Sequence, residues 1–560
     1  GLQGGAVVHI FDSLEKKKNG VTYTNHEQSA ALAAVSYAKC SQSTGCVVTT
    51  TGPASTNAIT GLLAAWQDSV PCLFISGQAR SNHTSYGKKV RQVGTQEVNI
   101  CDIVRPITKY TKFINNKNNF INEVNYAIKI AKEGRPGPVW LDIPIDLQWI
   151  DIKFPKNKLK KISISNKKNV VKNKLKLSLK LINQSSRPLL VLGYGVRSSN
   201  KSILKIKKLI FNKKIPFVTT WNGLDLLSTN NKFNLGIIGM SGQRGANKAI
   251  FKSDLLICLG THLSIPQTTP LTKNYAKDAK KLIVNIDKNQ LNNLNLSFDC
   301  KINADVGDYL KWLSKQKIKK FCWEDLNKFK KMNWYVPKKT NKPNSNFFIH
   351  TLTSRIKDKF CLVIDGGGTA LYSGFQSSAI KEKDRTICSS GISAMGTGLA
   401  ETIGVWQSGL FKKIVCVIGD GSFLMNVQDL QTIVQNKINV SIIIVNNNGY
   451  LAIRHTQKEF LNGRYYGTHP KWNLTMPSFK KISKAFGIDY FKVNRNLQIN
   501  SSMNKIIKRN GPLICELIVS DKQDSLFKQG YLKNKDGKFS PQPLDEMFPF
   551  LPKPLANTNN

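Results

Sequence analysis

The sequence predicts an α/β protein built from three doubly wound domains, each with a parallel sheet. Short apolar runs alternate with longer periodic segments along most of the chain. The runs are continuously apolar, as expected for parallel strands buried on both faces. Two polar segments rich in Lys and Asn, at about 151–180 and about 315–345, interrupt this alternation. We therefore expect domains at residues 1–150, 181–315 and 345–520, followed by a tail at 521–560.

The apolar runs indicate eleven strands. In chain order they are expected at 46–50, 72–75 and 139–142 in the first domain, at 189–192, 216–220, 255–259 and 282–286 in the second, and at 361–365, 414–418, 442–445 and 513–519 in the third. The tail is too rich in proline for regular structure, but residues 547–551 are too apolar to stay in solvent. We expect the tail to pack back onto the body of the protein.

The composition excludes several classes of protein. Of the 560 residues, 41% are apolar and 21% are charged, which is ordinary for a folded chain and argues against a disordered or fibrous one. No apolar run reaches the roughly 18–20 residues that span a bilayer, and no secretory signal is visible. The chain opens at Gly1, within what reads as a domain, so we expect native sequence to precede it. Eleven cysteines without a CxxC or a Cys/His cluster favour reduced thiols in a cytoplasmic protein over disulfides or zinc.

The chain is strongly basic, with 82 Lys and Arg against 35 Asp and Glu and a net charge of +47. Such a charge is compatible with binding to nucleic acid or another polyanion. However, the Lys and Asn residues are scattered, and no basic helix with interleaved aromatic residues is visible. We favour a compositional bias and expect no specific nucleic-acid partner; polyanion binding remains the alternative.

The strongest motif consists of two polar segments that follow neighbouring strands. Gly419, Asp420, Gly421 and Ser422 end one buried run, and residues 446–449 (Asn-Asn-Asn-Gly) end the next. Carboxyl ends of adjacent parallel strands share one edge of a sheet, where ligands bind. A carboxylate from Asp420, an amide oxygen from Asn447 and the backbone carbonyl of Gly449 would make a hard oxygen site suited to Mg²⁺. The glycines would let backbone N–H groups approach a diphosphate; two tight turns without a ligand are the alternative.

From Gly1 to about Val519 the chain resembles the acetolactate synthase family of thiamine-diphosphate enzymes. The GDGS and NN motif, with Asp420 and Asn447 27 positions apart, is similar to the family's diphosphate motif. Further similar segments are GGAVVHIFDSL at 4–14, TNHEQ at 24–28, TGPASTN at 51–57, GMSG…AN at 239–247 and SAMGTGL at 393–399. The resemblance implies a pyrimidine-binding domain, a central domain and a diphosphate-binding domain, in that order, and implies thiamine diphosphate and Mg²⁺ as cofactors.

The resemblance also implies roles for individual residues. Glu27 would hydrogen-bond N1′ of the cofactor's aminopyrimidine and so act in general acid–base catalysis through the ring. Without the resemblance, Glu27 would read as a helix N-terminal carboxylate and Met395 as core filler. Gln96 resembles the family's active-site glutamine near the substrate. The remaining implied cofactor contacts are Pro53 and Asn57 at the pyrimidine, the Ser393 carbonyl at the 4′-amino group, Met395 as the prop for the bent cofactor, and Gly419, Gly421, Ser422 and Asn447 at the diphosphate.

Three departures from the family pattern bear on substrate and flavin. The family's tryptophan that selects 2-oxobutyrate aligns with Thr456, which opens the acceptor pocket. Two arginines of the segment associated with FAD align with His262 and Pro266, which argues against FAD. The family's Gln-His pair near the diphosphate falls within residues 366–370, Gly-Gly-Gly-Thr-Ala. Together these changes resemble a branch that is associated with surface-sugar biosynthesis.

The sequence thus predicts an enzyme that decarboxylates a 2-oxo acid, pyruvate, and joins the two-carbon unit to a second carbonyl. With pyruvate as acceptor the product is 2-acetolactate, as in branched-chain amino acid biosynthesis. With a nucleotide-linked keto-sugar as acceptor the product is a branched sugar, and this alternative stays open. A cofactor-binding protein without catalysis is a hypothesis of another class. The resemblance implies a homodimer or tetramer, because in the family each site combines Glu27's domain with the diphosphate domain of a neighbouring subunit.

Overall fold

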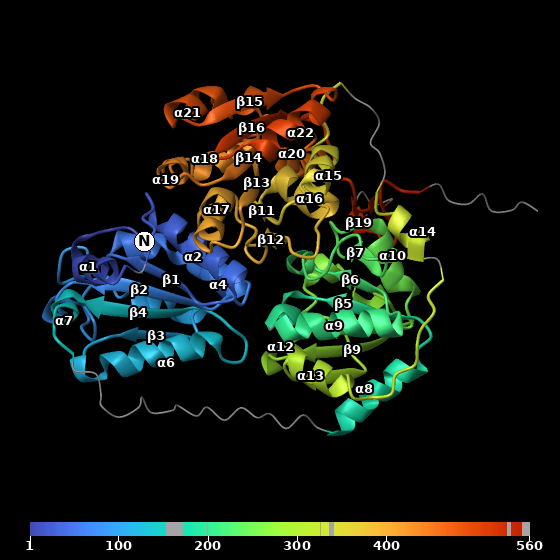
Figure 1. Ribbon diagram of the computed structural model, residues 1–560, viewed down its shortest axis with the longest axis horizontal. Coiled ribbons are helices and arrows are strands. Elements are labelled where there is room, and N and C mark those ends of the chain that lie inside the picture. The colour runs from blue at the N-terminus through green and yellow to red at the C-terminus, as the bar shows by residue number, and fades with distance from the viewer. Residues whose placement is uncertain are drawn as a thin grey trace, which may run out of the picture. The chain divides into compact units, whose positions relative to one another are not determined.

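The computed structural model describes residues 1–18, 20–152, 172–198, 200–270, 272–324, 326–334, 341–534 and 539–551. The chain divides into two compact units. The first unit comprises residues 1–166, 356–371 and 385–521, and the second comprises residues 167–355, 372–384 and 522–560. The first unit contains two large parallel sheets and the second contains one, and Figure 1 labels many of their strands and helices.

The first sheet has four parallel strands in the order β1-β2-β4-β3. The strands are β1 Gly45–Thr49, β2 Cys72–Gln78, β3 Tyr110–Phe113 and β4 Val139–Pro144, and the helices are α1 Val8–Lys16, α2 Glu27–Ser41, α3 Pro53–Asn57, α4 Ile59–Gln67, α5 Ile100–Val104, α6 Phe120–Lys132 and α7 Ile145–Gln148. Phe74 and Trp140 of the strands pack with Leu62 of α4 on one face, whereas Leu141 packs with Ala127 of α6 on the other. Helices therefore cover both faces of the sheet, as the doubly wound prediction requires.

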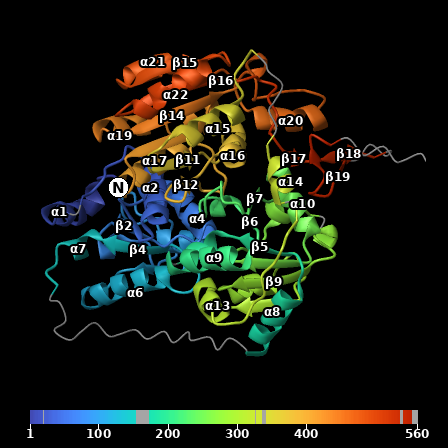
Figure 2. The same ribbon diagram turned by 45° about the vertical axis from the view of Figure 1, so that its right-hand side comes forward.

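The other sheet of the first unit has six parallel strands in the order β12-β11-β13-β14-β16-β15. Its strands are β11 Phe360–Ile364, β12 Arg385–Ile387, β13 Lys413–Gly419, β14 Val440–Asn446, β15 Asp489–Val493 and β16 Leu513–Ile518, and its helices are α17 Thr397–Gln407, α18 Asp420–Met425, α19 Asp429–Gln435, α20 Leu451–Phe460, α21 Phe479–Ala485 and α22 Gln498–Lys508. Helix α16 Gly368–Ser377 begins in this unit, and its residues from Tyr372 onward belong to the second unit. Helix α17 packs against α2, and the two helices lie side by side in Figure 1 and Figure 2. A Cβ at Gly404 would collide with the Ala33 carbonyl, so glycine permits this close approach.

The sheet of the second unit has six parallel strands in the order β10-β9-β8-β5-β6-β7. Its strands are β5 Pro188–Leu192, β6 Phe217–Thr219, β7 Asn234–Ile237, β8 Leu255–Leu259, β9 Lys280–Asn285 and β10 Cys300–Asn303, and its helices are α8 Lys172–Gln184, α9 Asn200–Lys213, α10 Arg244–Lys252, α11 Ile265–Thr268, α12 Lys288–Asn292, α13 Val306–Leu313, α14 Leu326–Lys331 and α15 Ser345–Arg355. Leu190 packs with Ile206 of α9 on one face, and Leu189 packs with Ala249 of α10 on the other. This sheet is also doubly wound.

The tail packs onto the second unit, as predicted. Phe527 and Met547 are buried, and the Gln376 amide donates to the Phe527 carbonyl at 2.6 Å. The expectation of no regular structure is wrong, because the tail forms two short antiparallel pairs. They are β17 Lys528–Gln529 with β20 Met547–Phe548, and β18 Tyr531–Lys533 with β19 Phe539–Pro541. Such short pairs use few ladder N–H groups, so nearby prolines do not prevent them.

All eleven predicted strands are present, with ends that differ by up to three residues. Five further strands of the large sheets were not predicted. They are β3, β7, β10, β12 and β15, and each lies at the edge of its sheet. Edge strands have one unpaired side and carry polar residues, as in the sequences Tyr-Thr-Lys-Phe and Arg-Thr-Ile. Continuously apolar runs mark buried central strands and do not mark these.

The two predicted polar linkers contain helices. Helix α8 begins at Lys172, within the segment that the sequence assigned to the first linker, and its Ile182 enters the core of the second unit. Helix α14 lies within the second linker and packs against α10. Residues 153–171 and 335–340 of these linkers lie outside the described residues.

Candidate active site

The two segments of the strongest motif meet at one edge of the six-stranded sheet in the first unit. Strands β13 and β14 are parallel neighbours, with Gly419 paired to Val445, so both polar segments follow the same sheet edge. The Asp420 carboxylate accepts from the Gly449 N–H at 2.9 Å and from the Gly421 N–H at 2.8 Å. The sequence motif therefore corresponds to a single local structure in which a carboxylate joins the ends of two strands.

Asp420 lies in a nearly closed environment, and burial raises the pKa of its carboxyl to about 6. The backbone N–H groups of Gly449, Gly421 and Asn447 and the charge of Arg454 oppose this rise, because all of them favour the carboxylate. At neutral pH the group is thus mainly ionised. A buried, ionised carboxylate at the end of a strand is suited to ligating a divalent cation.

Asn447 supplies a second oxygen that fits a cation. Its Oδ1 atom is buried and accepts no hydrogen bond from any described residue, whereas its Nδ2 group donates to Thr369 Oγ1 at 3.0 Å. A buried amide oxygen without a partner is costly unless a ligand satisfies it. The residues present therefore fit Mg²⁺, with Asp420, Asn447 and the Gly449 carbonyl as the available oxygen donors. Thr369, which fixes the amide, belongs to the segment where the family pattern has its Gln-His pair.

Two glycines at this edge allow close contacts that a larger side chain would block. A Cβ at Gly421 would collide with the Tyr450 ring, and a Cβ at Gly367 would collide with Met395. Met395 itself is 38% exposed, so it is not filler of the protein core. Ser393, two residues earlier, has φ +46°, a conformation that residues other than glycine rarely adopt. The SAMGTGL segment therefore presents an exposed methionine next to the GDGS turn.

Arg454 was not singled out from the sequence, yet it holds the loop that carries Asn447 and Gly449. The buried guanidinium donates to the carbonyls of Asn447 at 2.8 Å, Asn448 at 3.0 Å and Thr468 at 2.8 Å. Asn448 and Gly449 both have positive φ, so this loop departs from a regular backbone where the arginine braces it. The available signal was periodicity, because Arg454 shares the buried face of α20 with Leu451.

On the first sheet, Glu27 opens helix α2 and is largely buried. Its Oε2 accepts from Asn57 Nδ2 at 3.1 Å, so two predicted site residues meet. His26 caps the helix by accepting from the Gln28 N–H at 3.1 Å, which fixes the turn before Glu27. Asn57 ends helix α3, which begins at Pro53. The structure thus places Asn57 as a hydrogen-bond donor that orients the Glu27 carboxylate.

Gln96 lies beside the same turn. It has φ +59°, and its carbonyl accepts from Thr51 Oγ1 at 3.2 Å and covers Gly52, where a Cβ would collide with it. Thr51 also donates to Gln78 Oε1 at 2.8 Å, and Gln78 donates to Asp142 at 2.9 Å. Gln96 is therefore positioned by a buried polar chain that starts in strands β2 and β4.

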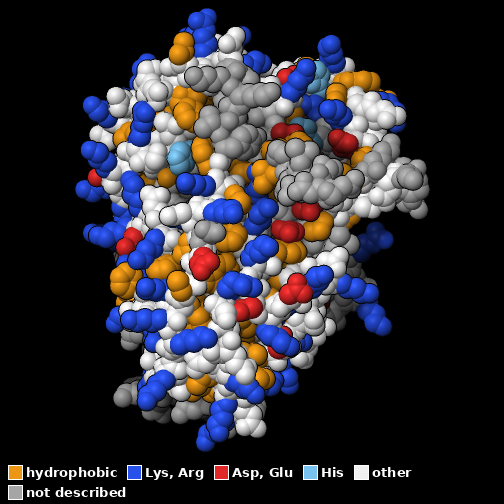
Figure 3. Space-filling model, turned by 90° about the vertical axis from the view of Figure 1, so that its right-hand side faces the viewer, with side chains coloured by type: hydrophobic (Ala, Val, Ile, Leu, Met, Phe, Trp, Pro, Cys, Tyr) orange, Lys and Arg blue, Asp and Glu red, His pale blue; other side chains and the backbone are white. Residues whose placement is uncertain are grey.

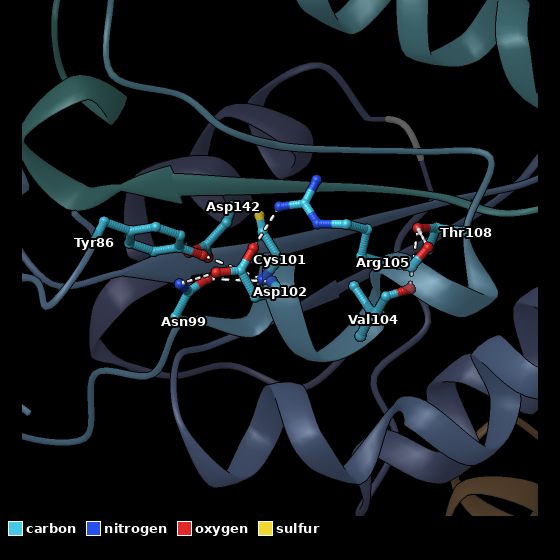
Figure 4. Close-up of polar contacts among 8 residues, drawn as sticks. All are labelled: Tyr86, Asn99, Cys101, Asp102, Val104, Arg105, Thr108 and Asp142. Carbon is cyan, nitrogen blue, oxygen red and sulfur yellow. Dashed lines mark hydrogen bonds and ion pairs between the residues drawn. The ribbon is translucent and has the colours of Figure 1, made fainter. Parts of the chain in front are cut away.

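The loop that carries Gln96 is anchored by hydrogen bonds before and after it. Figure 4 draws these contacts of Tyr86 and Asn99. Before Gln96, the Tyr86 hydroxyl donates to Asp142 at 3.1 Å and accepts from the Cys101 N–H at 3.2 Å. After it, Asn99 caps helix α5 by accepting from the Asp102 N–H at 3.2 Å. Burial raises the pKa of Asp142 to about 7, while donors from Ser76, Gln78 and Tyr86 oppose the rise. No sequence motif marks Asp142 or Tyr86 as supports for this loop.

The predicted site residues fall into two groups, and in the described part of the chain no hydrogen bond joins one group to the other. The pyrimidine group comprises Glu27, Pro53, Asn57 and Gln96; the diphosphate group comprises Ser393, Met395, Gly419, Asp420, Gly421, Ser422, Asn447 and Gly449. The two groups belong to different sheets of one unit. Gln28, next to Glu27, accepts a hydrogen bond at its Oε1 atom from Asn426 Nδ2. Asn426 directly follows the last residue of α18, the helix that begins at Asp420.

Two of the three departures from the family pattern, at Thr456 and at Pro266, have different structural settings. Thr456 lies on the exposed side of α20, away from the face that buries Arg454. In the second unit, Pro266 lies in α11 and its carbonyl accepts from the Met240 N–H at 2.8 Å. The segment that lacks the family's arginines therefore packs against the GMSG segment, as two parts of one local structure.

Three family descriptions match the chain in order. They are "Thiamine pyrophosphate enzyme, N-terminal TPP binding domain" at residues 1–103, the corresponding "central domain" at 175–313 and the "C-terminal TPP binding domain" at 366–517. By fold and matched domains the chain is a thiamine pyrophosphate enzyme. No helix in the described ranges is long and apolar enough to cross a membrane.

Individual relatives narrow this class. The acetolactate synthase large subunit of Porphyra purpurea is 31% identical over 546 residues, which cover 94% of this chain and 89% of the relative. The acetolactate synthase isozyme 2 large subunit of Escherichia coli K12 is 26% identical over 537 residues, covering 93% and 92% respectively. The chain belongs to the acetolactate synthase family, which confirms the predicted family and makes it a thiamine-diphosphate-dependent carboligase.

Proposed function

We propose that this chain decarboxylates pyruvate and joins the two-carbon unit to a second carbonyl, with 2-acetolactate as the product when that carbonyl is another pyruvate. The observation that carries the proposal is the buried, unpartnered Asn447 amide oxygen beside the Asp420 carboxylate. A buried amide oxygen without a partner is costly unless a ligand satisfies it, so the pair supports a bound Mg²⁺ of the kind that holds a diphosphate cofactor. The test is product analysis with pyruvate alone, in the presence of thiamine diphosphate and Mg²⁺. Absence of both CO₂ release and acetolactate would contradict the proposal.

In this proposal Mg²⁺ is held by Asp420, Asn447 and the Gly449 carbonyl, and the diphosphate by the N–H groups of the GDGS turn. When bound, thiamine diphosphate supplies a carbon centre that accepts the electron pair left by the departing CO₂. Glu27 holds a proton at the cofactor's N1′ atom, and Asn57 keeps the Glu27 carboxyl in place. Gln96 faces the substrate from a loop whose backbone Thr51 fixes.

We further propose that the complete site needs two chains, in a homodimer or a tetramer. The support is that the two groups of site residues lie on different sheets and share no hydrogen bond within the described chain. Met395, Met425 and Ile453 are exposed large apolar residues near the diphosphate group, as expected of a face that a second copy covers.

Hybrid complementation tests this shared site. Chains with Glu27→Gln and chains with Asp420→Ala are each expected to be inactive alone. Mixed under conditions of subunit exchange, they should regain partial activity, because one of the two sites in a hybrid dimer then has both intact groups. Full activity in a verified monomer of the unmodified protein would contradict the proposal.

A second candidate function is transfer of the two-carbon unit to a nucleotide-linked keto-sugar. The observation that favours it is Thr456 on the exposed side of α20, where the family pattern has a tryptophan. A hydroxyl in place of an indole leaves room for a larger acceptor, and one methylene of discrimination is worth only about 1–3 kcal/mol even in a fitted pocket. In a competition assay we expect little preference for 2-oxobutyrate over pyruvate. Thr456→Trp should raise that preference and block a keto-sugar acceptor; strong selectivity for 2-oxobutyrate in the unmodified protein would refute this candidate.

Flavin binding is proposed to be weak or absent. His262 and Pro266 stand where the family pattern has arginines, and without each arginine's charge-assisted hydrogen bond FAD binding would weaken by about 1.5–3 kcal/mol. The absorbance spectrum of the purified protein is the test, and a stoichiometric flavin band would contradict it. Localisation in the cytoplasm stays a prediction; all eleven cysteines lie in the described ranges, and none of them forms a disulfide there.

A further inference from the structure

Asp365 is a fully buried carboxylate to which the sequence assigned no role. It follows strand β11 directly and accepts from the Gly398 N–H at 3.1 Å and from the Gly367 N–H at 3.2 Å. The Gly396 N–H and the Ser422 hydroxyl also face it and favour its charge. Four donors thus converge on one side chain.

The four donors come from three separate segments, and all three adjoin the diphosphate group of site residues. Gly367 lies in the Gly-Gly-Gly turn after β11, Gly396 and Gly398 lie at the start of α17 beside Met395, and Ser422 lies in the first turn of α18. The segments touch closely, because a Cβ at Gly366 would collide with the Ala394 carbonyl and a Cβ at Gly367 with Met395. All three segments therefore contact the Asp365 side chain.

The four donors favour the ionised form of Asp365, because each of them lowers its pKa. Both oxygens of a carboxylate only accept hydrogen bonds. A protonated carboxyl or an amide would place its own O–H or N–H donor against the N–H and O–H donors of the protein. Helix α17 begins at Thr397, and its N-cap residue Gly396 provides no side-chain cap, so Asp365 satisfies the Gly398 N–H at this helix start. The charge of Asp365 helps to raise the pKa of Glu401 of α17, of Cys388 and of Cys416, whereas Lys39 of α2 lowers the pKa of Glu401.

We propose that ionised Asp365 is a positioning residue that holds the Met395 segment, the start of α17 and Ser422 in the arrangement that binds the diphosphate cofactor. The inference depends on the proposed function, because it needs thiamine diphosphate to bind at this edge. It assigns Asp365 no contact with the cofactor. Its effect passes through Ser422 and the Met395 segment, whose backbone the carboxylate fixes.

The test is the variant Asp365→Asn, which keeps the size of the side chain and removes the charge. Binding of thiamine diphosphate in saturating Mg²⁺ is measured by calorimetry, and melting temperature is measured without cofactor. We expect the dissociation constant to rise at least tenfold at pH 8, while the cofactor-free melting temperature changes by only a few degrees. The fold is expected to tolerate the change, because burial raises the pKa of Asp365 to about 6 and the charge itself is unfavourable there.

The pH profile separates positioning from mere structural support. As pH falls from 8 to 5.5, Asp365 and Asp420 both take up protons in the unmodified protein, and both changes should weaken cofactor binding. In Asp365→Asn only the contribution of Asp420 remains, so the profile should be flatter than that of the unmodified protein. The matched control is Asp429→Asn, which removes another fully buried carboxylate of the same unit that accepts no hydrogen bond of ordinary geometry from the described residues. The control should keep the affinity and the pH profile of the unmodified protein.

Unchanged affinity and an unchanged pH profile in Asp365→Asn would overturn the inference, as would a collapse of cofactor-free stability without loss of affinity in the folded fraction. Should the variant not fold, the cofactor-induced rise in melting temperature of the unmodified protein is compared at pH 8 and pH 5.5. An equal rise at both values would overturn the inference. Failure of the proposed function looks different, because then the unmodified protein and Asp429→Asn would not bind thiamine diphosphate either.

Discussion

At the edge of β13 and β14, Asp420 accepts two backbone N–H bonds, and Arg454 braces the neighbouring loop through three carbonyls. At the start of α2, Glu27 accepts one side-chain bond, from Asn57. The diphosphate group is thus built largely from backbone, glycines and buried charge, and the pyrimidine group from one carboxylate and its orienting amide. We infer that changes in the first group should act mainly on cofactor binding, and changes in the second on turnover.

The largest expected effect is that of Asp420→Ala. The change removes the proposed anionic metal ligand and leaves the Gly421 and Gly449 N–H groups without their acceptor. We expect no measurable binding of thiamine diphosphate with Mg²⁺ and turnover reduced by about a thousandfold or more. Calorimetry and a pyruvate consumption assay measure these quantities. Cofactor affinity close to that of the unmodified protein would contradict the metal assignment.

Glu27→Gln tests the pyrimidine group in the same way. The amide keeps the shape of the side chain but cannot hold an acidic proton at N1′. We expect thiamine diphosphate affinity within a few-fold of the unmodified protein and turnover lower by about a hundredfold, typical of losing a positioned acid–base group. Turnover near that of the unmodified protein would remove Glu27 from the mechanism, and a complete loss of cofactor affinity would erase the distinction between the two groups.

Arg454→Met tests whether Arg454 holds the loop that carries Asn447 and Gly449. The methionine fills similar space but gives up three charge-assisted bonds of about 1.5–3 kcal/mol each. Loss of a positive charge near Asp420 acts in the opposite direction and is the smaller effect. We expect the Mg²⁺ concentration for half-saturation to rise by about tenfold, with turnover at saturating Mg²⁺ within a few-fold. Lys458→Met, on the exposed side of the same helix, is the control and should change neither quantity.

The smallest effect concerns stability. Burial raises the pKa of Asp429 to about 7, although the Ser29 hydroxyl opposes the rise. Because the folded state holds this proton more tightly than the unfolded state, stability is favoured at low pH and is lost as pH rises through about 7. Asp429→Asn should therefore raise the free energy of unfolding by about 1–3 kcal/mol at pH 8 and hardly change it at pH 4. Denaturant titrations at both pH values measure this, and lower stability at pH 8 would be the opposite result.

The sequence predicts strands well where a strand is buried along its whole length. Central strands such as β13 and β14 are continuously apolar, and the polar residues after them lie at a common edge, so the sheets and the meeting of Asp420 with Gly449 could be predicted. Edge strands such as β3 and β15 interleave polar residues and were missed. Family resemblance supplied the roles of Glu27 and Gln96, which stay predictions.

Supporting residues are harder to predict than the motifs they support. Arg454 and Asp365 each have a backbone partner farther along the chain, Thr468 and Gly398 respectively, and no short motif records such partners. Asp365 stands at the end of a predicted strand, where the apolar run indicates the strand but not the partners of its last residue. A charged residue that adjoins a buried strand, or shares the buried face of a helix, must find polar partners elsewhere in the fold, and this requirement is the sequence signal that both residues carry.

The dispersion of positive charge has a consequence for association kinetics. Figure 3 shows Lys and Arg side chains spread over the visible face, with few acidic side chains between them. A net charge of +47 surrounds the protein with an attractive potential for anions, and both a diphosphate and a 2-oxo acid are anions. The potential reaches about 30 Å at 0.01 M salt but only about 10 Å at 0.1 M. Capture of cofactor and substrate should therefore slow as ionic strength rises, even where the chemical step is unaffected.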